Sequence, residues 1–174
     1  MNILIVKLSA IGDVVHTLPS LAALRKRFPD AHITWAVEEA AADLLCGHPH
    51  LDRVLVSGRK TWLRRMGDGQ IASPLREMGG FFRELRDRPY DLVIDFHGLF
   101  KSGAIVFLSR GKRRLGYDSM QEMSGLFLNE KIPEDMTKHA VDRYLDFVAY
   151  LGGGTAKREF LIPIGEENRR RIDL

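Results

Sequence analysis

Residues 7–19 read Lys-Leu-Ser-Ala-Ile-Gly-Asp-Val-Val-His-Thr-Leu-Pro and directly follow an apolar run over residues 3–6. Such a run, bounded by small and polar residues, is typical of a strand buried on both faces of a parallel sheet. The turn after it leads into a helical pattern that contains one early acid, Asp13. In open α/β sheets, ligands bind at the carboxyl ends of the strands. The stretch therefore predicts a strand, a turn and a helix, with Asp13 where a ligand site would lie.

Strand and helix patterns alternate along the rest of the chain, which favours an α/β fold with a Rossmann-like, doubly wound parallel sheet. We expect strands at residues 2–7, 32–37, 52–56, 90–96 and 113–117, and helices at 14–28, 38–46, 74–88, 101–109 and 139–151. Residues 57–73 are predicted to form a long basic loop. Residues 120–130 are ambiguous, residues 159–164 look extended, and residues 165–174 begin a further charged helix.

The composition is ordinary for a globular domain, with 45% hydrophobic and 28% charged residues in a chain of 174. The single cysteine, Cys46, excludes an internal disulfide and a cysteine-rich zinc site, and it favours a reducing compartment. No signal peptide is expected, and no apolar run approaches the roughly 18 residues of a membrane span.

Basic residues are unevenly distributed although the net charge is only +3. Residues 53–67 carry five cations and no acid before position 68, and residues 110–114 form a second basic cluster. Clusters of this kind suggest an anionic partner, but they are also common on a solvated face. A nucleic-acid site would require more aromatic residues and a wider basic stripe.

Asp13 has a simpler interpretation as a helix N-cap, because aspartate accepts hydrogen bonds from the first free N–H groups of a helix. The loop before it, residues 8–12, contains one glycine only. It therefore lacks the Gly-x-Gly-x-x-Gly pyrophosphate fingerprint and the Gly-Lys-Ser/Thr ending of a P-loop. Its backbone N–H groups could still hold an anionic group. The pattern alone leaves both interpretations of Asp13 open.

Several histidines and basic residues are weaker candidates. His97 follows the fourth expected strand, so it faces the same crevice as Asp13, although a structural role is an equal alternative. Lys101 opens the next helix, where it could contact an anion. His139 and Arg143 are four residues apart and share a helix face, as ordinary surface residues also do. The other histidines show no set of three ligands, so no metal site is expected.

Four segments, taken in order, resemble the lipopolysaccharide heptosyltransferases. They are residues 2–19, with the specific string Ile-Gly-Asp-Val-Val-His-Thr-Leu-Pro; residues 35–39, Trp-Ala-Val-Glu-Glu; residues 91–102, Asp-Leu-Val-Ile-Asp-Phe-His-Gly-Leu-Phe-Lys-Ser; and residues 139–143, His-Ala-Val-Asp-Arg. The Arg-Lys-x-Trp segment at 59–62 and the last segment are most similar to heptosyltransferase I.

The resemblance implies an inverting GT-B glycosyltransferase built from two Rossmann-like domains, of Gram-negative bacteria. Such an enzyme transfers L-glycero-D-manno-heptose from ADP-heptose to the Kdo-lipid A inner core of lipopolysaccharide. Residues 1–164 would be the acceptor-binding N-terminal domain, and residues 165–174 the start of the connection to an absent donor-binding domain. This half alone is expected to be inactive. The resemblance implies no cofactor and no metal.

The resemblance also implies roles for particular residues. Asp13 would be the general base. The expected acceptor-binding residues are Ser9, Gly12, Arg59, Lys60, Arg64, Arg65, His97, Lys101, His139 and Arg143. Position 97 departs from the family pattern, in which glutamine precedes Gly-Leu, so the role of His97 stays open.

The implied partners are the Kdo-lipid A acceptor and the ADP-heptose donor, with no nucleic acid and no protein partner. The implied location is the cytoplasm, in peripheral contact with the cytoplasmic face of the inner membrane. Two alternatives remain. One is a heptosyltransferase II or III that acts on a later core heptose. The other, from a different class, is a nucleotide- or nucleic-acid-binding α/β module that uses the basic segment at residues 53–67.

Overall fold

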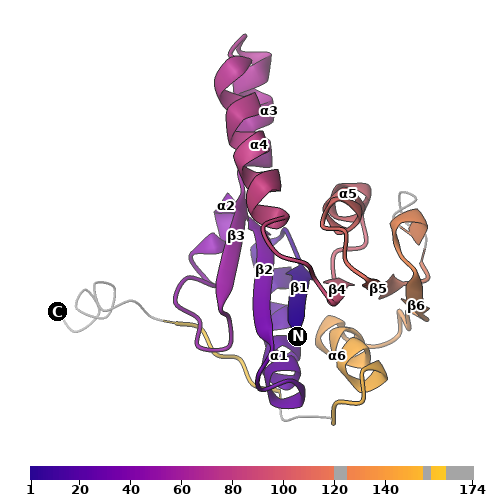
Figure 1. Ribbon diagram of the computed structural model, residues 1–174. Helices are drawn as coiled ribbons and strands as arrows, with labels where there is room; N and C mark the ends of the chain where they lie inside the picture. Colours follow the sequence, from indigo (N-terminus) through magenta and orange to yellow (C-terminus); the bar gives the residue numbers. More distant parts are fainter. Residues whose placement is uncertain (120–124, 155–157, 164–174) are drawn as a thin grey trace, which may run out of the picture.

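The fold is a six-stranded parallel sheet with helices on both faces (Figure 1). The computed structural model describes residues 1–119, 125–154 and 158–163. The strand order is β3-β2-β1-β4-β5-β6. The strands are β1 (Asn2–Val6), β2 (His32–Glu38), β3 (Arg53–Ser57), β4 (Leu92–Asp95), β5 (Arg113–Tyr117) and β6 (Glu130–Ile132). The predicted α/β class and the five expected strands are thereby confirmed.

Strand β1 lies at the centre of the sheet and pairs with β2 on one side and β4 on the other. Val6, its last residue, is opposite Ala36 of β2 and Asp95 of β4. The order of strands reverses between β1 and β4, and such a switch point opens a crevice at the carboxyl ends of the strands. The turns after β1 and β4 therefore meet at one place.

Helices cover the two faces of the sheet and bury an apolar cluster on each. Ile3 and Ile5 of β1 pack with α1 and α6, whereas Leu4 and Val6 pack with α4, α5 and Trp62 of α3. This two-sided burial explains why β1 is a continuous apolar run. The helices are α1 (Ile11–Arg27), α2 (Glu39–Ala42), α3 (Arg59–Gly67), α4 (Ala72–Leu85), α5 (Phe100–Leu108) and α6 (Ala140–Tyr150).

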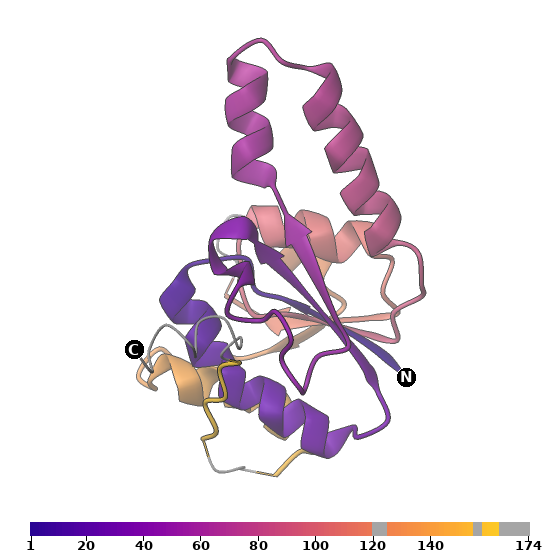
Figure 2. The same cartoon turned by 90° about the vertical axis from the view of Figure 1, so that its left-hand side faces the viewer.

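Helices α3 and α4 form a helical hairpin, residues 59–85, that projects from the sheet (Figure 2). The prediction of a long loop at residues 57–73 is therefore wrong. Trp62 explains the helix, because its ring is buried against Phe81 of α4 and its Nε1 donates to Glu77 Oε2 at 3.0 Å. The packing around the Trp62 ring is tight, since a Cβ on Gly58 would lie 2.8 Å from that Nε1. Tertiary packing thus orders a segment whose basic composition resembles a loop.

The start of α1 also differs from the sequence prediction. The helix begins at Ile11 rather than residue 14, and its N-cap is Ala10. Asp13 therefore lies inside the first turn, and the interpretation of Asp13 as an N-cap is wrong. Strand β6 emerges from the ambiguous segment, while α2 is shorter than expected. The expected helix at residues 165–174 lies outside the described residues.

None of the helices in the described ranges combines the length and the apolar character needed to cross a bilayer.

Candidate active site

A polar cavity of about 300 Å³ opens at the carboxyl ends of β1 and β4. We call it the Asp13 cavity. It lies at the switch point of the sheet, where the topology predicts a ligand site. Its polar lining comes from five different parts of the chain. The polar side chains are Lys7, Asp13, His97, Tyr117, Ser119, Glu134, Arg143 and Tyr144.

Asp13 and Lys7 form the centre of this cavity. The Lys7 ammonium is almost fully buried, and its Nζ donates to the Phe96 carbonyl oxygen at 3.0 Å and to the Tyr144 hydroxyl at 2.8 Å. It also lies 3.6 Å from Asp13 Oδ2. Burial lowers the pKa of Lys7 below its usual value, and the Asp13 carboxylate partly opposes that shift. The Asp13 side chain remains 47% exposed, so its carboxylate is held by Lys7 yet open to the cavity.

The turn after β4 is held by a buried carboxylate. Asp95 Oδ1 accepts from the backbone N–H groups of His97 at 2.9 Å and Gly98 at 3.1 Å. Its Oδ2 accepts from the Ser102 hydroxyl at 2.9 Å. Gly98 has a φ of +71°, which a glycine adopts without strain. Although burial raises the pKa of Asp95, these donors fix the turn and thereby set the position of His97.

The His97 ring lies in the Asp13 cavity with its hydrogen-bonding capacity unused. Both ring nitrogens are buried, and neither has a hydrogen-bond partner among the residues that the structure describes. Burial lowers the pKa of His97 to about 4, and the charges of Lys7 and Lys101 act in the same direction. The ring is therefore neutral near pH 7, with one N–H donor and one acceptor nitrogen.

A second charged group surrounds the carboxylate of Glu38, at the end of β2. Its oxygens lie 3.4 Å from Arg59 Nη2, 3.2 Å from Lys60 Nζ and 3.3 Å from Lys101 Nζ. Lys101 also donates to the Ser9 hydroxyl at 3.0 Å. Burial alone would raise the pKa of Glu38, but Lys101 and Lys60 outweigh that effect and lower it. We call these residues the Glu38 cluster; it contains four of the expected acceptor-binding residues and carries a net positive charge.

The expected residues of the last helix take different positions. Arg143 lines the Asp13 cavity, where its Nη1 is 2.5 Å from Glu134 Oε1. His139 is instead the N-cap of α6, because its Nδ1 accepts from the Val141 backbone N–H at 3.3 Å. Its ring also contacts the ring of His16. Arg143 is thus brought to the cavity, whereas His139 shapes the start of the helix that carries Arg143.

The remaining expected residues are spread more widely. Arg65 is held on the hairpin by Glu77 and Ser73, with an Nη1–Oε1 distance of 2.8 Å to Glu77. Arg64 beside it is exposed, and no contact of its side chain is recorded within the described ranges. Gly12 lies in the first turn of α1, where an added Cβ would meet nothing within 4 Å. The structure therefore does not gather all the expected basic residues into one surface.

Ion pairs within the basic segment also bear on the alternative that this chain is a nucleic-acid-binding module. Arg53 lies 2.5 Å from Asp87, Arg59 and Lys60 contact Glu38, and Arg65 contacts Glu77. Carboxylates therefore contact four of the five cations at residues 53–67 and offset the charges of Arg53 and Arg65, whereas the single carboxylate of Glu38 leaves an excess of positive charge beside Arg59 and Lys60. A continuous basic stripe, as a nucleic-acid backbone requires, is not formed by these residues.

Three residues of the site were not singled out from the sequence. Lys7 ends a buried apolar strand, and a lysine is rarely buried without a partner, so its position was a usable signal. Glu38 is the last residue of β2 and lies at the same edge of the sheet. Asp95 has no local signal, because its three hydrogen-bond donors are recognisable only after the turn has formed.

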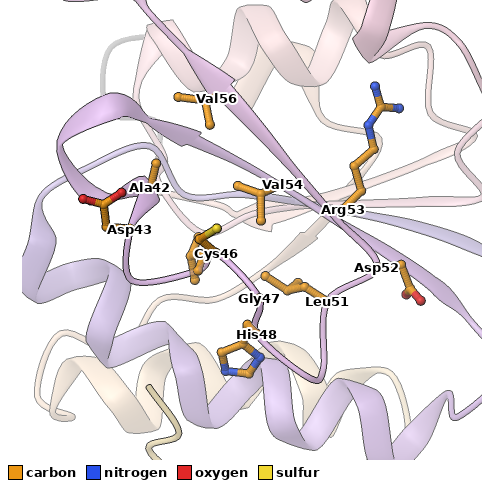
Figure 3. Close-up of a pocket in the computed structure, with 11 residues that line it drawn as sticks. Ala42, Asp43, Cys46, Gly47, His48, Leu51, Asp52, Arg53, Val54 and Val56 are labelled. Atoms are coloured by element: carbon orange, nitrogen blue, oxygen red, sulfur yellow. The ribbon is translucent and has the colours of Figure 1, made fainter. Parts of the chain in front are cut away.

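Another cavity, of about 590 Å³, lies beside the edge strand β3 (Figure 3). It contains none of the expected site residues. Its charged side chains are largely engaged elsewhere, since Asp52 Oδ2 accepts from Arg25 at 2.6 Å and His48 Nε2 is 3.0 Å from the Leu161 carbonyl oxygen. No three histidine, cysteine, aspartate or glutamate side chains within the described ranges are grouped to hold a metal ion. The Asp13 cavity is thus the stronger candidate.

Comparisons with known proteins point to one family. A sequence model of glycosyltransferase family 9 (heptosyltransferase) matches residues 78–170. Lipopolysaccharide heptosyltransferase 1 of Salmonella typhimurium is 36% identical over 152 residues, covering 86% of this chain and 47% of that protein. Its namesake from Escherichia coli (strain K12) is 35% identical over 153 residues, with coverages of 86% and 47%. The chain spans about half the length of these curated relatives.

The fold agrees with the sequence comparison. The structure of E. coli heptosyltransferase WaaC with ADP-2-deoxy-2-fluoro heptose superimposes with a TM-score of 0.82 at 32% identity, covering 92% of this chain and 52% of that chain. The family model alone spans over half of this chain. The sheet with its polar cavity at the switch point, the relatives and the family match all agree. The chain therefore belongs to glycosyltransferase family 9, the heptosyltransferases.

Proposed function

We propose that this chain is the acceptor-binding half of an inverting heptosyltransferase of type I. The complete enzyme transfers L-glycero-D-manno-heptose from ADP-heptose to the Kdo-lipid A inner core of lipopolysaccharide. Two relatives carry the name lipopolysaccharide heptosyltransferase 1, and the solved WaaC structure is described with a fluorinated ADP-heptose. Both support this choice of donor and family member.

The observation that carries the proposal is the half-exposed carboxylate of Asp13 in the switch-point cavity. A general base must reach the proton that it removes, and Asp13 is open to a ligand in that cavity. In the proposed step, Asp13 takes the proton of an acceptor hydroxyl while that oxygen attacks the anomeric carbon of the heptose. The bond from that carbon to the ADP oxygen breaks, ADP leaves with the electron pair, and the configuration inverts.

Neighbouring groups position this base. Lys7 holds the Asp13 carboxylate in place through an ion pair, and the Lys7 ammonium is itself fixed by the Phe96 carbonyl and the Tyr144 hydroxyl. Asp13 also lies in the first turn of α1, where a carboxylate interacts favourably with the helix dipole. The neutral His97 ring lines the cavity, and a turn of the ring that uncovers one of its buried nitrogens would let it bind a sugar hydroxyl. These residues together orient the acceptor toward Asp13.

The anionic groups of the acceptor require cations at the same edge of the sheet. Arg59, Lys60 and Lys101 surround one carboxylate, so the Glu38 cluster keeps a positive charge for Kdo carboxylates or lipid A phosphates. Arg143 contributes a further cation inside the Asp13 cavity. Exposed Arg64 is available for the same ligand from the hairpin.

We further propose the division of labour between domains. Residues 1–164 bind the acceptor, and residues 165–174 begin the connection to a donor-binding half that holds the nucleotide. Leu8 to Gly12 lacks a pyrophosphate fingerprint, which agrees with a nucleotide site elsewhere. The reaction as written needs neither a metal nor a cofactor.

We also propose that the enzyme works at the cytoplasmic face of the inner membrane, in peripheral contact with it. Exposed residues of the hairpin support this location, because Leu63, Ile71 and Leu75 are exposed on it and the exposed Arg64 follows Leu63 in α3. Apolar side chains next to basic ones are typical of elements that lie on an anionic lipid surface.

The test is a transfer assay with the full-length protein. ADP-heptose is offered together with either a Kdo-terminated acceptor or an acceptor that already carries the first heptose. The proposal predicts transfer to the Kdo-terminated acceptor, with inversion at the anomeric carbon. Transfer only to the heptose-bearing acceptor would instead assign the enzyme to the type II or III step, and no transfer to either would overturn the proposal.

A further inference from the structure

A third cavity, of about 280 Å³, lies where the hairpin meets α5, and its walls are mostly apolar. Figure 2 shows the hairpin rising from the sheet with α5 near its base. We call this cavity the apolar pocket. Its size is at the lower end of ordinary ligand pockets. Its walls are formed by Trp62 of α3, Met78, Phe81 and Phe82 of α4, and Ala104 and Ile105 of α5.

The walls of the apolar pocket present carbon rather than unpaired polar atoms. The one polar atom of Trp62, its Nε1, already donates to Glu77 at 3.0 Å. The Phe81 and Trp62 rings pack against each other with centroids 6.0 Å apart, which fixes the shape of the wall. These apolar walls favour hydrocarbon over water, because water finds hydrogen-bond partners only at the margin of the pocket.

The pocket also has charged residues at its margin. Arg59 and Lys101 line it, and both contact Glu38, at 3.4 Å and 3.3 Å. Because Lys60 contacts the same carboxylate, three cations face one anion and the margin keeps a positive charge. An apolar pocket beside excess cations fits an amphiphile with an anionic group and a hydrocarbon chain.

Contacts connect this pocket to the proposed reaction centre. Lys101, at the pocket, donates to the Ser9 hydroxyl at 3.0 Å. Ser9 lies in the turn that leads from β1 to Asp13. Ser57, also at the pocket, pairs with Glu38 between β3 and β2. The apolar pocket, the Glu38 cluster and the Asp13 cavity therefore share one edge of the sheet.

We propose that the apolar pocket holds part of an acyl chain of the lipid acceptor while the Glu38 cluster holds its anionic groups. This inference rests on the proposed function, because the lipid acceptor is the substrate named there. The occupant follows from the combination of apolar walls, cationic margin and contact with the turn before Asp13. A deacylated sugar would leave the pocket unused.

The experiment fills the pocket in the full-length protein. Ala104→Phe places a ring in the pocket from α5, and Ala149→Phe, on an exposed position of α6, is the matched control. Transfer is measured with the acylated acceptor and with the same acceptor stripped of its acyl chains. Ala104→Phe should raise the KM for the acylated acceptor about tenfold relative to the KM for the stripped one, the discrimination given by one displaced methylene in a fitted site. The control should leave both values unchanged.

Equal effects of Ala104→Phe on both acceptors, or no effect on the acylated one, would overturn the proposal. If Ala104→Phe lowers the melting temperature of the protein, the smaller Ala104→Leu replaces it, with the same expected direction.

A binding measurement tests the acyl-chain pocket independently of the proposed heptose transfer. Calorimetry compares dodecyl phosphate, below its micelle concentration, with inorganic phosphate. Tighter binding of dodecyl phosphate that Ala104→Phe abolishes supports an alkyl site, even if the parent protein transfers heptose to no acceptor. Equal affinities for the two phosphates overturn the alkyl site, even if transfer to a Kdo-terminated acceptor is observed.

Discussion

The Asp13 cavity and the hairpin carry the same kinds of charged residue, but the fold uses them differently. In the cavity, Lys7 is 3% exposed and three separate groups fix its ammonium. On the hairpin, Arg65 is fixed by Glu77 and Ser73 near the surface. A buried charge is costly unless its partners are in place, whereas surface pairs contribute little energy. The comparison teaches that burial fixes the charged groups of the cavity in one arrangement, whereas the ion pairs of the hairpin lie near the surface and join its two helices.

The largest expected effect comes from the cavity. In the full-length protein, Asp13→Ala should lower kcat for heptose transfer at least about a hundredfold, because general-base catalysis supplies a factor of about 10²–10⁴. The affinity for ADP-heptose, measured by calorimetry, should stay nearly unchanged. Asp30→Asn, at an exposed position just beyond the other end of α1, is the control and should retain full activity. Retained turnover in Asp13→Ala would show that the cavity is not the reaction centre.

The next effect concerns the hairpin. Trp62 is 7% exposed, and truncation of a buried tryptophan costs about 3–5 kcal/mol. Trp62→Ala should therefore open the hairpin locally and speed hydrogen exchange of its amides, residues 59–85, while β1 and β4 keep their protection. The neighbouring Leu63→Ala, at a side chain that is 53% exposed, should change little. Equal loss of protection in β1 would show that the hairpin and the cavity are one stability unit.

A smaller effect is expected on acid stability. The pKa of His97 is about 4 in the folded protein, against an ordinary value of 6.5. Between these values the unfolded chain binds the additional proton, so stability should fall as the pH drops from 6.5 toward 4. His97→Gln should remove this loss of unfolding free energy between pH 6.5 and 4. The loss amounts to roughly 2 kcal/mol or less, after allowance for the partial exposure of the His97 side chain. The melting temperatures of the two proteins between pH 4 and 7 give the comparison, and parallel curves would contradict the neutral buried ring.

The smallest effect separates two adjacent arginines. Arg64→Ala should weaken acceptor binding by roughly two- to fivefold at low salt and less at high salt, as for an exposed charge contact. Arg65→Ala should instead destabilise the hairpin, because Arg65 contacts Glu77 and Ser73. Acceptor titrations at two salt concentrations, together with hydrogen exchange of residues 59–85, distinguish the two roles. If Arg65→Ala weakened acceptor binding and Arg64→Ala destabilised the hairpin, the two roles would have to be exchanged.

Much of the fold could be predicted because local pattern and tertiary role agree in the sheet. Residues 3–6 are apolar on both faces, and β1 is indeed covered on both faces. Gly152, the residue directly after the helix expected at residues 139–151, has a φ of +77°, as glycines that end helices commonly do. In the hairpin, α4 matches the helix expected at residues 74–88, but α3 could not be predicted, since it depends on contacts of Trp62 with Phe81 and Glu77 in the other helix.

The candidate site divides in the same way. Asp13 follows the central strand, so strand order alone places it at the switch point. The sequence predicted His97 at the same edge but not its unpaired ring nitrogens, which result from burial. It predicted one anion-binding surface, whereas the structure separates the Glu38 cluster from Arg65 and makes His139 a helix cap. Which charged side chains pair depends on the distances between helices and strands in the folded protein, and a local sequence pattern does not contain those distances.

By itself, the sequence determined the parallel sheet, the position of Asp13 at a strand end and the resemblance to the heptosyltransferases. It could do so because apolar periodicity and short motifs are local properties of the chain. Only the tertiary structure decided that Asp13 lies inside the helix and beside Lys7, that Glu38 gathers three cations, and that an apolar pocket adjoins them. These features arise from burial and from contacts between distant segments, which exist only once the chain is packed.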